Sequence, residues 1–254
     1  MLIRRVNEHV RTQNWFAVGI DFLIVVVGVV MGLQVSNWNE ARAEQAATER
    51  TLELLIARIE SYRIGADSFR TYYETTRVYG EAALTGWADE TAMSDVEFLA
   101  AAYQASQISG STDDSAINAQ LIGAENVRNV RDADLQQRLR DFIASPVITR
   151  QNDVNTPYRQ NVRRAMPFAI QDIIRAECGD FREGPRATLV LPPTCVIELP
   201  EDQAAEAAQD LRMRLDLRDD LRWHLASAET VLFDLESELE RHRQLVEAVR
   251  TYLD

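Results

Sequence analysis

The chain has 254 residues, of which 46% are hydrophobic and 26% are charged, so it is long enough for one or two folded domains and is not a wholly disordered protein. Its formal net charge of −13 and pI near 4.8 argue against nucleic acid as a partner, because phosphate binding requires a basic surface. All 27 basic residues are arginines, and the 10 glycines and 7 prolines leave little room for a glycine-rich phosphate loop or a proline-rich linker.

The first predicted element is a transmembrane helix over residues 16–37. Residues Phe16–Val35 read FAVGIDFLIVVVGVVMGLQV and contain a single charge. A helix of about twenty residues spans about 30 Å, the thickness of the hydrocarbon core of a bilayer. Trp15 and Trp38 flank the run, as expected for side chains that anchor a helix at the lipid headgroups. A buried core helix and a cleaved signal peptide are the alternatives, but the run is long for either and has no polar stripe.

The distribution of arginine predicts the orientation of this helix. Segment 1–15 carries three arginines, whereas Arg42 is the only basic residue in the dozen positions that follow Val35. The positive-inside rule then places residues 1–15 in the cytoplasm. Residues 38–254 are expected in the periplasm of a Gram-negative bacterium, with the lipid of the inner membrane as one partner.

Cysteine usage fits an oxidising compartment. Cys178 and Cys195 bracket sixteen residues that include two glycines and three prolines. Two cysteines around such a loop predict a disulfide, which stabilises the fold by about 3 kcal/mol in the chain-entropy model. Two unpaired thiols are the alternative. The sequence has no CxxC motif, so a thioredoxin-like redox site is not expected.

One face of the membrane helix carries Asp21, Gly28 and Gly32. At 100° per residue, each glycine lies within about 20° of Asp21 around the helix axis. The GxxxG spacing lets another helix approach closely, and a carboxylate inside a membrane usually faces a partner or an ion path. We predict a helix–helix interface in a homo-oligomer or a larger envelope complex. Two alternatives stay open: Asp21 carries protons or ions, or it lies hydrated near the cytoplasmic interface and the glycines are incidental.

Two long amphipathic helices are predicted, over residues 38–84 and 201–253. Each has apolar residues at alternating steps of three and four, which indicates coiled-coil-like packing. The second helix follows Pro200 and begins with two acidic residues, which suit a first turn. The helices could pair antiparallel within one chain, or parallel between copies in an oligomer. The seam positions are Leu52, Leu55, Ile59, Tyr62, Ala66, Phe69, Tyr73, Thr76, Gly80 and Ala83 in the first, and Leu221, Leu225, Ala228, Leu232, Leu235, Leu239, His242, Val246, Val249 and Leu253 in the second.

The region between them is predicted as shorter helices over residues 94–177, followed by a cysteine loop over 178–199. The run Ser94–Glu97 is a capping box that opens the first of these helices. Within the loop, the β-prone runs Thr188–Leu191 and Cys195–Ile197 flank two prolines, and we expect them to form a small hairpin. The predicted fold class is therefore all-α: one transmembrane helix that continues into an elongated helical bundle.

Catalytic and metal-binding signatures are nearly absent. The three histidines do not pair with one another or with a cysteine at metal-ligand spacing, so no catalytic residue, cofactor or metal is expected. His242 falls on the predicted seam, where a half-buried imidazole would titrate near neutral pH. Four tyrosines between Tyr62 and Tyr79 are expected to pack in the core, or else to line a small-molecule pocket.

Asp21 and the run Leu33–Glu40, which reads LQVSNWNE, resemble an uncharacterised family of small bacterial single-pass inner-membrane proteins. Members of that family have an acidic residue at this place in the span, an exit close to LQ-aliphatic-x-NWNE and then a long charged helix. Residues 116–142 are similar to its middle segment. Asp21 stands where the family pattern has Glu, and the cysteine loop is not part of that pattern. The resemblance implies a single-pass topology and carries no activity.

Three functions are compatible with these features. The first is a membrane-anchored periplasmic interaction or scaffold module, an oligomeric or accessory subunit of an envelope complex without catalysis. The second is a sensor-like ligand-binding bundle that signals through a partner. The third is an ion-coupled membrane subunit that uses Asp21.

Overall fold

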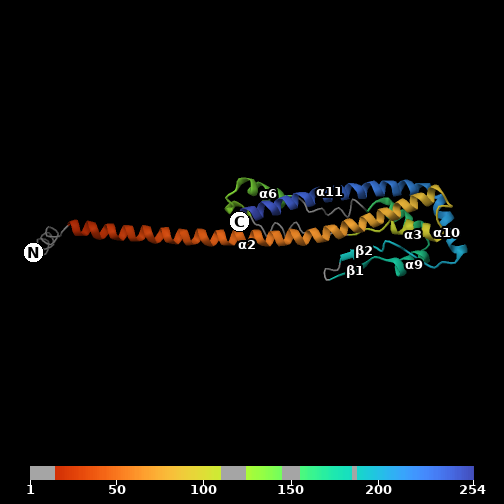
Figure 1. The fold of residues 1–254 in the computed structure, drawn as a ribbon, viewed down its shortest axis with the longest axis horizontal. Coiled ribbons are helices and arrows are strands. Elements are labelled where there is room, and N and C mark those ends of the chain that lie inside the picture. The colour runs from red at the N-terminus through yellow and green to blue at the C-terminus, as the bar shows by residue number, and fades with distance from the viewer. Residues whose placement is uncertain (1–14, 110–123, 145–154, 185–187) are drawn as a thin grey trace, which may run out of the picture. The chain divides into compact units, whose positions relative to one another are not determined.

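The computed structural model describes residues 15–109, 124–144, 155–184 and 188–254, and it is mostly helical (Figure 1). The chain divides into two compact units, Met1–Thr51 and Leu52–Asp254, which we describe separately. The elements in chain order are α2 (Trp15–Ala88), α3 (Asp95–Gln104), α5 (Ala124–Asn129), α6 (Ala133–Ala144), α8 (Pro157–Ala165), α9 (Phe168–Cys178), β1 (Phe181–Glu183), β2 (Thr188–Val190), α10 (Glu201–Met213) and α11 (Leu215–Leu253). The all-α prediction with a small hairpin near the cysteines is confirmed.

The first unit contains the N-terminal part of α2. The side chains described between Gly19 and Ala47 are all exposed, and none packs into a core. The predicted transmembrane residues 16–37 all lie in this helix from its beginning at Trp15. The predicted helix over 38–84 is therefore the continuation of the same helix, which ends at Ala88.

In the second unit, the C-terminal part of α2 runs antiparallel to α11 (Figure 1). At one end of the pair, Arg77 Nη1 donates to Glu229 Oε1 at 2.9 Å. At the other end, Arg250 Nη2 donates to Glu60 Oε1 at 3.3 Å. Of the two arrangements that the sequence allows, the structure has the antiparallel pair within one chain.

The buried face of α11 includes seven of the ten predicted seam positions and extends beyond them. The buried positions at steps of three and four are Leu217, Leu221, His224, Ala228, Val231, Leu235, Glu238, His242, Leu245 and Val249. Leu225 and Leu239, which the sequence places on the seam, are only half-buried. The difference arises because α11 packs against α6 and α8 as well as α2, so its buried face is wider than a two-helix seam.

Two hydrophobic cores hold the second unit together. The smaller one joins Leu55 of α2 to Leu139 of α6 and Val249 of α11. The larger one is built around α3, whose residues from Phe98 to Gln104 are all buried. The capping box predicted at the start of α3 is present, because Ser94 Oγ accepts from the Glu97 backbone N–H while the Glu97 carboxylate accepts from the Ser94 N–H.

The predicted helix over 201–253 is interrupted at Arg214 and forms α10 and α11. Arg214 has φ −86° and ψ 78°, outside the helical region. Its guanidinium donates to both carboxylate oxygens of Asp216, at 2.9 and 2.7 Å. Asp216 lies in the first turn of α11, where an acidic side chain is favoured by the helix dipole, so the local charges favour a new helix start here.

The hairpin lies earlier in the chain than the sequence predicts. The strand β1, Phe181–Glu183, pairs antiparallel with β2, and Arg182 lies opposite Leu189. The strand predicted at Thr188–Leu191 is confirmed and covers Thr188–Val190, whereas the strand predicted at Cys195–Ile197 is not present. Cys195 is instead bonded to Cys178 at the end of α9, and this disulfide fixes the path of the chain beyond β2.

Candidate functional sites: an exposed apolar helix, a groove and a buried polar cluster

The first candidate site is the apolar N-terminal part of α2. The helix carries an 18-residue window near its N-terminal end with a mean hydropathy of 1.6, and none of that window is buried. Phe22 is 70% exposed, and most of the aliphatic side chains from Leu23 to Val35 are exposed to a similar degree. Within the part of the chain that the structure describes, α2 is the helix that is long enough and apolar enough to cross a membrane.

The two glycines of the predicted interface lie open on this helix. A Cβ added to Gly28 or to Gly32 would have no neighbouring atom within 4 Å, and the same holds for Gly19. Gly19 and Gly28 are nine positions apart, which places Gly19 on the opposite face of the helix. The backbones of Asp21 and Trp15 are helical, but their side chains lie outside the described part of the structure.

The second predicted membrane anchor, Trp38, is 57% exposed. The guanidinium of Arg42 lies 4.5 Å from the centroid of its ring, a cation–π contact one helical turn along α2. An amphipathic ring paired with a cation is the combination expected where a helix leaves the hydrocarbon region.

Cys178 and Cys195 form the predicted disulfide, with a Cα–Cα distance of 5.3 Å. The backbone carbonyl of Cys178 also accepts a hydrogen bond from Gln104 Nε2 at 2.6 Å. Gln104 is the last residue of α3 and is buried. The disulfide therefore ties the loop after β2 to the same point at which α9 meets α3.

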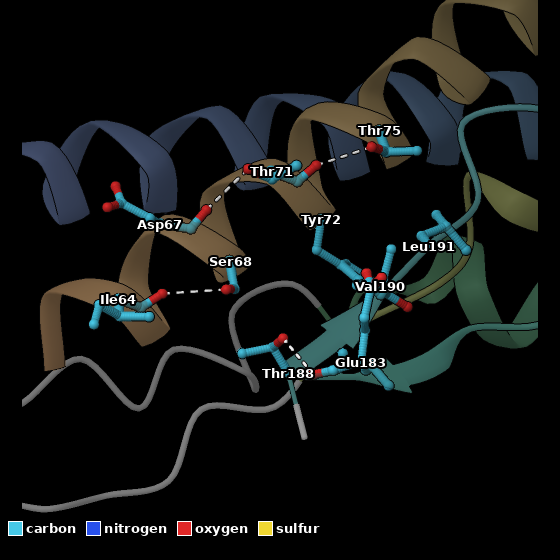
Figure 2. Close-up of a pocket in the computed structure, with 11 residues that line it drawn as sticks. Ile64, Asp67, Ser68, Thr71, Tyr72, Thr75, Glu183, Thr188, Val190 and Leu191 are labelled. Atoms are coloured by element: carbon cyan, nitrogen blue, oxygen red, sulfur yellow. Dashed lines mark hydrogen bonds between the residues drawn. The ribbon is translucent and has the colours of Figure 1, made fainter. Parts of the chain in front are cut away.

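A groove of about 370 Å³ lies between α2 and the hairpin strand β2 (Figure 2). The α2 side presents Ser68, Thr71 and Thr75, each of which donates its hydroxyl to the carbonyl of the residue four positions earlier. Two carboxylates, Asp67 and Glu183, also line it. Because the hydroxyl protons are already used, the groove offers mainly acceptor oxygens and apolar surface. The lining residues are Ile64, Asp67, Ser68, Thr71, Tyr72, Thr75, Glu183, Thr188, Leu189, Val190 and Leu191.

Behind the groove, two buried tyrosines of α2 make long-range polar contacts. Tyr72 donates its hydroxyl to Asp180 Oδ2 at 3.2 Å, and burial together with this carboxylate raises the pKa of Tyr72. The Tyr73 hydroxyl donates to the Ser109 carbonyl and accepts from the Ser109 N–H, both at 3.1 Å. Burial raises the pKa of Tyr73 as well. Both phenols therefore stay protonated and act as structural donors that fix neighbouring loops to α2.

Two arginines of α8, Arg159 and Arg163, lie beside this cluster. Arg159 Nη1 donates to the Ser106 carbonyl at 2.6 Å. Arg163 donates from Nε to Ser106 Oγ at 3.2 Å and from Nη2 to Gln107 Oε1 at 2.9 Å. Desolvation lowers the pKa of both guanidiniums. Sequence analysis missed this pair, and the one available signal was the spacing of two arginines one turn apart on an amphipathic helix.

Both histidines of α11 are buried and belong to the core. His224 Nδ1 is 2.8 Å from Thr156 Oγ1, and burial lowers the pKa of His224 to about 4. His242 Nε2 lies 3.6 Å from Glu238 Oε1, and burial followed by the charge of Arg241 lowers the pKa of His242 to about 4. His242 lies on the seam as predicted, but it is buried rather than half-buried, so the condition for titration near neutral pH is not met.

No group of three or more histidine, cysteine or carboxylate side chains in the described ranges could hold a metal ion. Comparison with protein-family models, with curated proteins and with solved structures finds no match for the chain. The resemblance of Asp21 and Leu33–Glu40 to a family of single-pass membrane proteins therefore stays a prediction.

Proposed function

We propose that the protein is a membrane-anchored helical interaction module, a scaffold or accessory subunit of an envelope complex. The observation that carries this proposal is the exposed apolar part of α2. A water-soluble protein rarely exposes so large a continuous apolar surface, whereas a bilayer covers it completely. The same helix then enters a bundle in which two hydrophobic cores contain most of the described buried side chains, as expected of a protein that acts by contact.

The proposed location is the inner membrane of a Gram-negative bacterium, with residues 1–15 in the cytoplasm and 38–254 in the periplasm. The arginines near the N-terminus support this orientation through the positive-inside rule. The disulfide between Cys178 and Cys195 supports it independently, because disulfides persist in the oxidising periplasm and are rare in the cytosol.

Association through the face of Asp21, Gly28 and Gly32 is the proposed mode of assembly. No side chain within 4 Å occupies the space above either glycine, so a helix of a partner or of a second copy can approach their backbones. Gly19 provides a matched control, because it has the same open surroundings and lies on the opposite face.

The test compares the mass of the complex in mild detergent for the wild type, the double variant Gly28→Leu/Gly32→Leu and the control Gly19→Leu. We expect the double variant to shift the complex to a smaller mass, with the control unchanged. Equal masses for all three chains would exclude this face as the interface.

The variant Asp21→Asn tests the role of the carboxyl group. Loss of assembly would place the carboxyl group in the interface, whereas retained assembly with loss of function in cells would support ion coupling instead.

A ligand-binding bundle is the second candidate, and the groove between α2 and β2 is the observation that favours it. Thr71 is exposed on the wall of this groove, so Thr71→Arg fills the space without disturbing the core. Native mass spectrometry of protein purified from cells is expected to show a bound small molecule in the wild type and none in Thr71→Arg. Identical spectra without added mass would exclude the groove as a retained-ligand site.

A further inference from the structure

The two half-buried arginines of α8 carry more positive charge than the described residues around them balance. Arg159 and Arg163 are half-buried and lie one helical turn apart. Within the described residues, their hydrogen bonds go to uncharged acceptors on Ser106 and Gln107, and neither forms an ion pair with a carboxylate. A guanidinium removed from water without a counter-charge is costly, so the arrangement calls for a negative partner.

Among the described residues, the neighbouring groups supply only part of that charge. Ser106 follows the C-terminal end of α3, where the helix dipole contributes about half a negative charge to be shared by two guanidiniums. Asp180, which also accepts a hydrogen bond from the Tyr72 hydroxyl, is the described carboxylate whose charge acts on Arg159, and it offsets part of the positive charge there. The charge of Arg175 also acts on Arg163, which adds to the positive excess.

Unused hydrogen-bond donors remain at the same place. A guanidinium has five N–H donors. The side chains of Arg159 and Arg163 together donate three hydrogen bonds to described residues, so most of their donors are not used in these bonds. None of their nitrogens is among the buried, unpartnered nitrogens of the described residues, and both side chains are partly exposed. Arg163 lies over the ring of Tyr103 at 4.7 Å. Tyr103 is only 1% exposed, and its hydroxyl has no partner within the described chain.

We infer that Arg159 and Arg163 form a binding site for a small oxyanion, a phosphate or carboxylate group carried by a free small molecule. The planar fork of a guanidinium matches two oxygens of such a group, and two forks one turn apart can hold it between them. The ring of Tyr103 keeps the Arg163 guanidinium in place from below. This site lies on α8, at the end of α3, and is separate from the groove between α2 and β2.

The test uses the full chain in detergent and follows its thermal unfolding as inorganic phosphate or succinate replaces chloride at constant ionic strength. A ligand that binds the folded state raises Tm in a saturable manner. We expect saturable stabilisation of the wild type by at least one of the two oxyanions, and a loss of affinity of about tenfold or more in Arg163→Gln. The two titrations distinguish a phosphate from a carboxylate ligand.

Arg164→Gln is the matched control, because Arg164 is exposed on the same helix and its removal changes the net charge equally. Its affinity for the oxyanion should equal that of the wild type. A second variant, Arg159→Lys, retains the charge but loses the fork, and we expect an affinity reduced severalfold. If the wild type shows no saturable stabilisation, or if Arg164→Gln weakens binding as much as Arg163→Gln, the site does not exist as described.

Discussion

Helix α2 contains two regions with the same backbone conformation and opposite patterns of burial. From Gly19 to Ala47 the described side chains are exposed on every face, although the first half of this stretch is almost entirely apolar. From Leu52 to Ala88 the helix buries one side, and the exposed side carries polar residues together with a few apolar ones such as Leu54 and Val78. A helix that is apolar on all sides requires an apolar solvent, whereas a one-sided stripe requires a protein partner. The comparison supports the proposal that lipid covers the apolar half of the first region, whereas the bundle covers the buried side of the second.

The largest expected effect contrasts two leucines of α2. Leu55 is fully buried in the smaller core, whereas Leu33 is 59% exposed. Leu55→Ala should lower the free energy of unfolding by about 2–5 kcal/mol, because it leaves a cavity between α2, α6 and α11. Urea unfolding of the detergent-solubilised chain, followed by near-UV circular dichroism, measures the change. Leu33→Ala should leave this transition in place, and equal losses in the two variants would abolish the contrast.

Removal of the disulfide should be a second large effect, comparable with that of Leu55→Ala. The bond joins residues 17 positions apart, so replacing both cysteines with serine should destabilise the second unit by about 3 kcal/mol. Urea unfolding of the double variant, compared with the wild type under non-reducing conditions, checks this value. Wild-type protein treated with dithiothreitol is the control and should match the variant. Because the disulfide lies far along the chain from the apolar region, the wild type and the double variant should require the same detergent for extraction from the membrane. A different requirement would show that the two regions are not independent.

Acidification should destabilise the bundle. Burial lowers the pKa of His224 and of His242 to about 4 in the folded state, against 6.5 in the unfolded state. The unfolded chain therefore binds more protons below pH 6.5, and stability falls as the pH decreases towards 4. Between pH 7 and pH 5 the loss is about 2 kcal/mol per histidine.

Urea unfolding at pH 7, 6 and 5 measures this slope. In the double variant His224→Gln/His242→Gln the slope should flatten, although its stability at pH 7 is lower because the Thr156 contact changes. A wild-type stability that does not change between pH 7 and pH 5 would contradict the burial of these imidazoles.

The smallest effects come from two glycines in the second region of α2. A Cβ on Gly86 would lie 2.6 Å from the Phe98 ring, which is fully buried and contacts both Trp87 and the Arg212 guanidinium. Gly86→Ala should therefore cost about 1–2 kcal/mol, since overpacking outweighs the gain in helix propensity. Gly65 has open surroundings, so Gly65→Ala should stabilise by up to about 1 kcal/mol. Thermal unfolding shifts of the same sign in both variants would contradict the packing described here.

Features set by local sequence were predictable. The apolar run of α2, the Ser94–Glu97 capping box and the start of α10 after Pro200 all depend on residues close together in the chain. The pairing of Cys178 with Cys195 was predictable because the chain has only two cysteines.

Features set by long-range contacts were not predictable. Phe181–Glu183 has no alternating pattern and becomes a strand only because β2 pairs with it. Glu238 occupies a buried heptad position that sequence analysis would assign to an apolar residue. From the sequence alone, Arg159 and Arg163 would be assigned to a solvent-exposed helix face. Their contacts with Ser106 and Gln107 join residues more than fifty positions apart, so they depend on the packing of α8 against α3.

Protease accessibility in intact spheroplasts tests the central claim most directly. Trypsin added from outside should digest the second unit of the full chain and leave a short membrane-protected fragment that contains Phe22–Val35, while a cytoplasmic marker stays intact. The abundance of arginine in the second unit makes such digestion easy to detect. A chain that resists trypsin until the inner membrane is lysed, with the marker cleaved at the same time, would contradict the proposed anchor and its orientation.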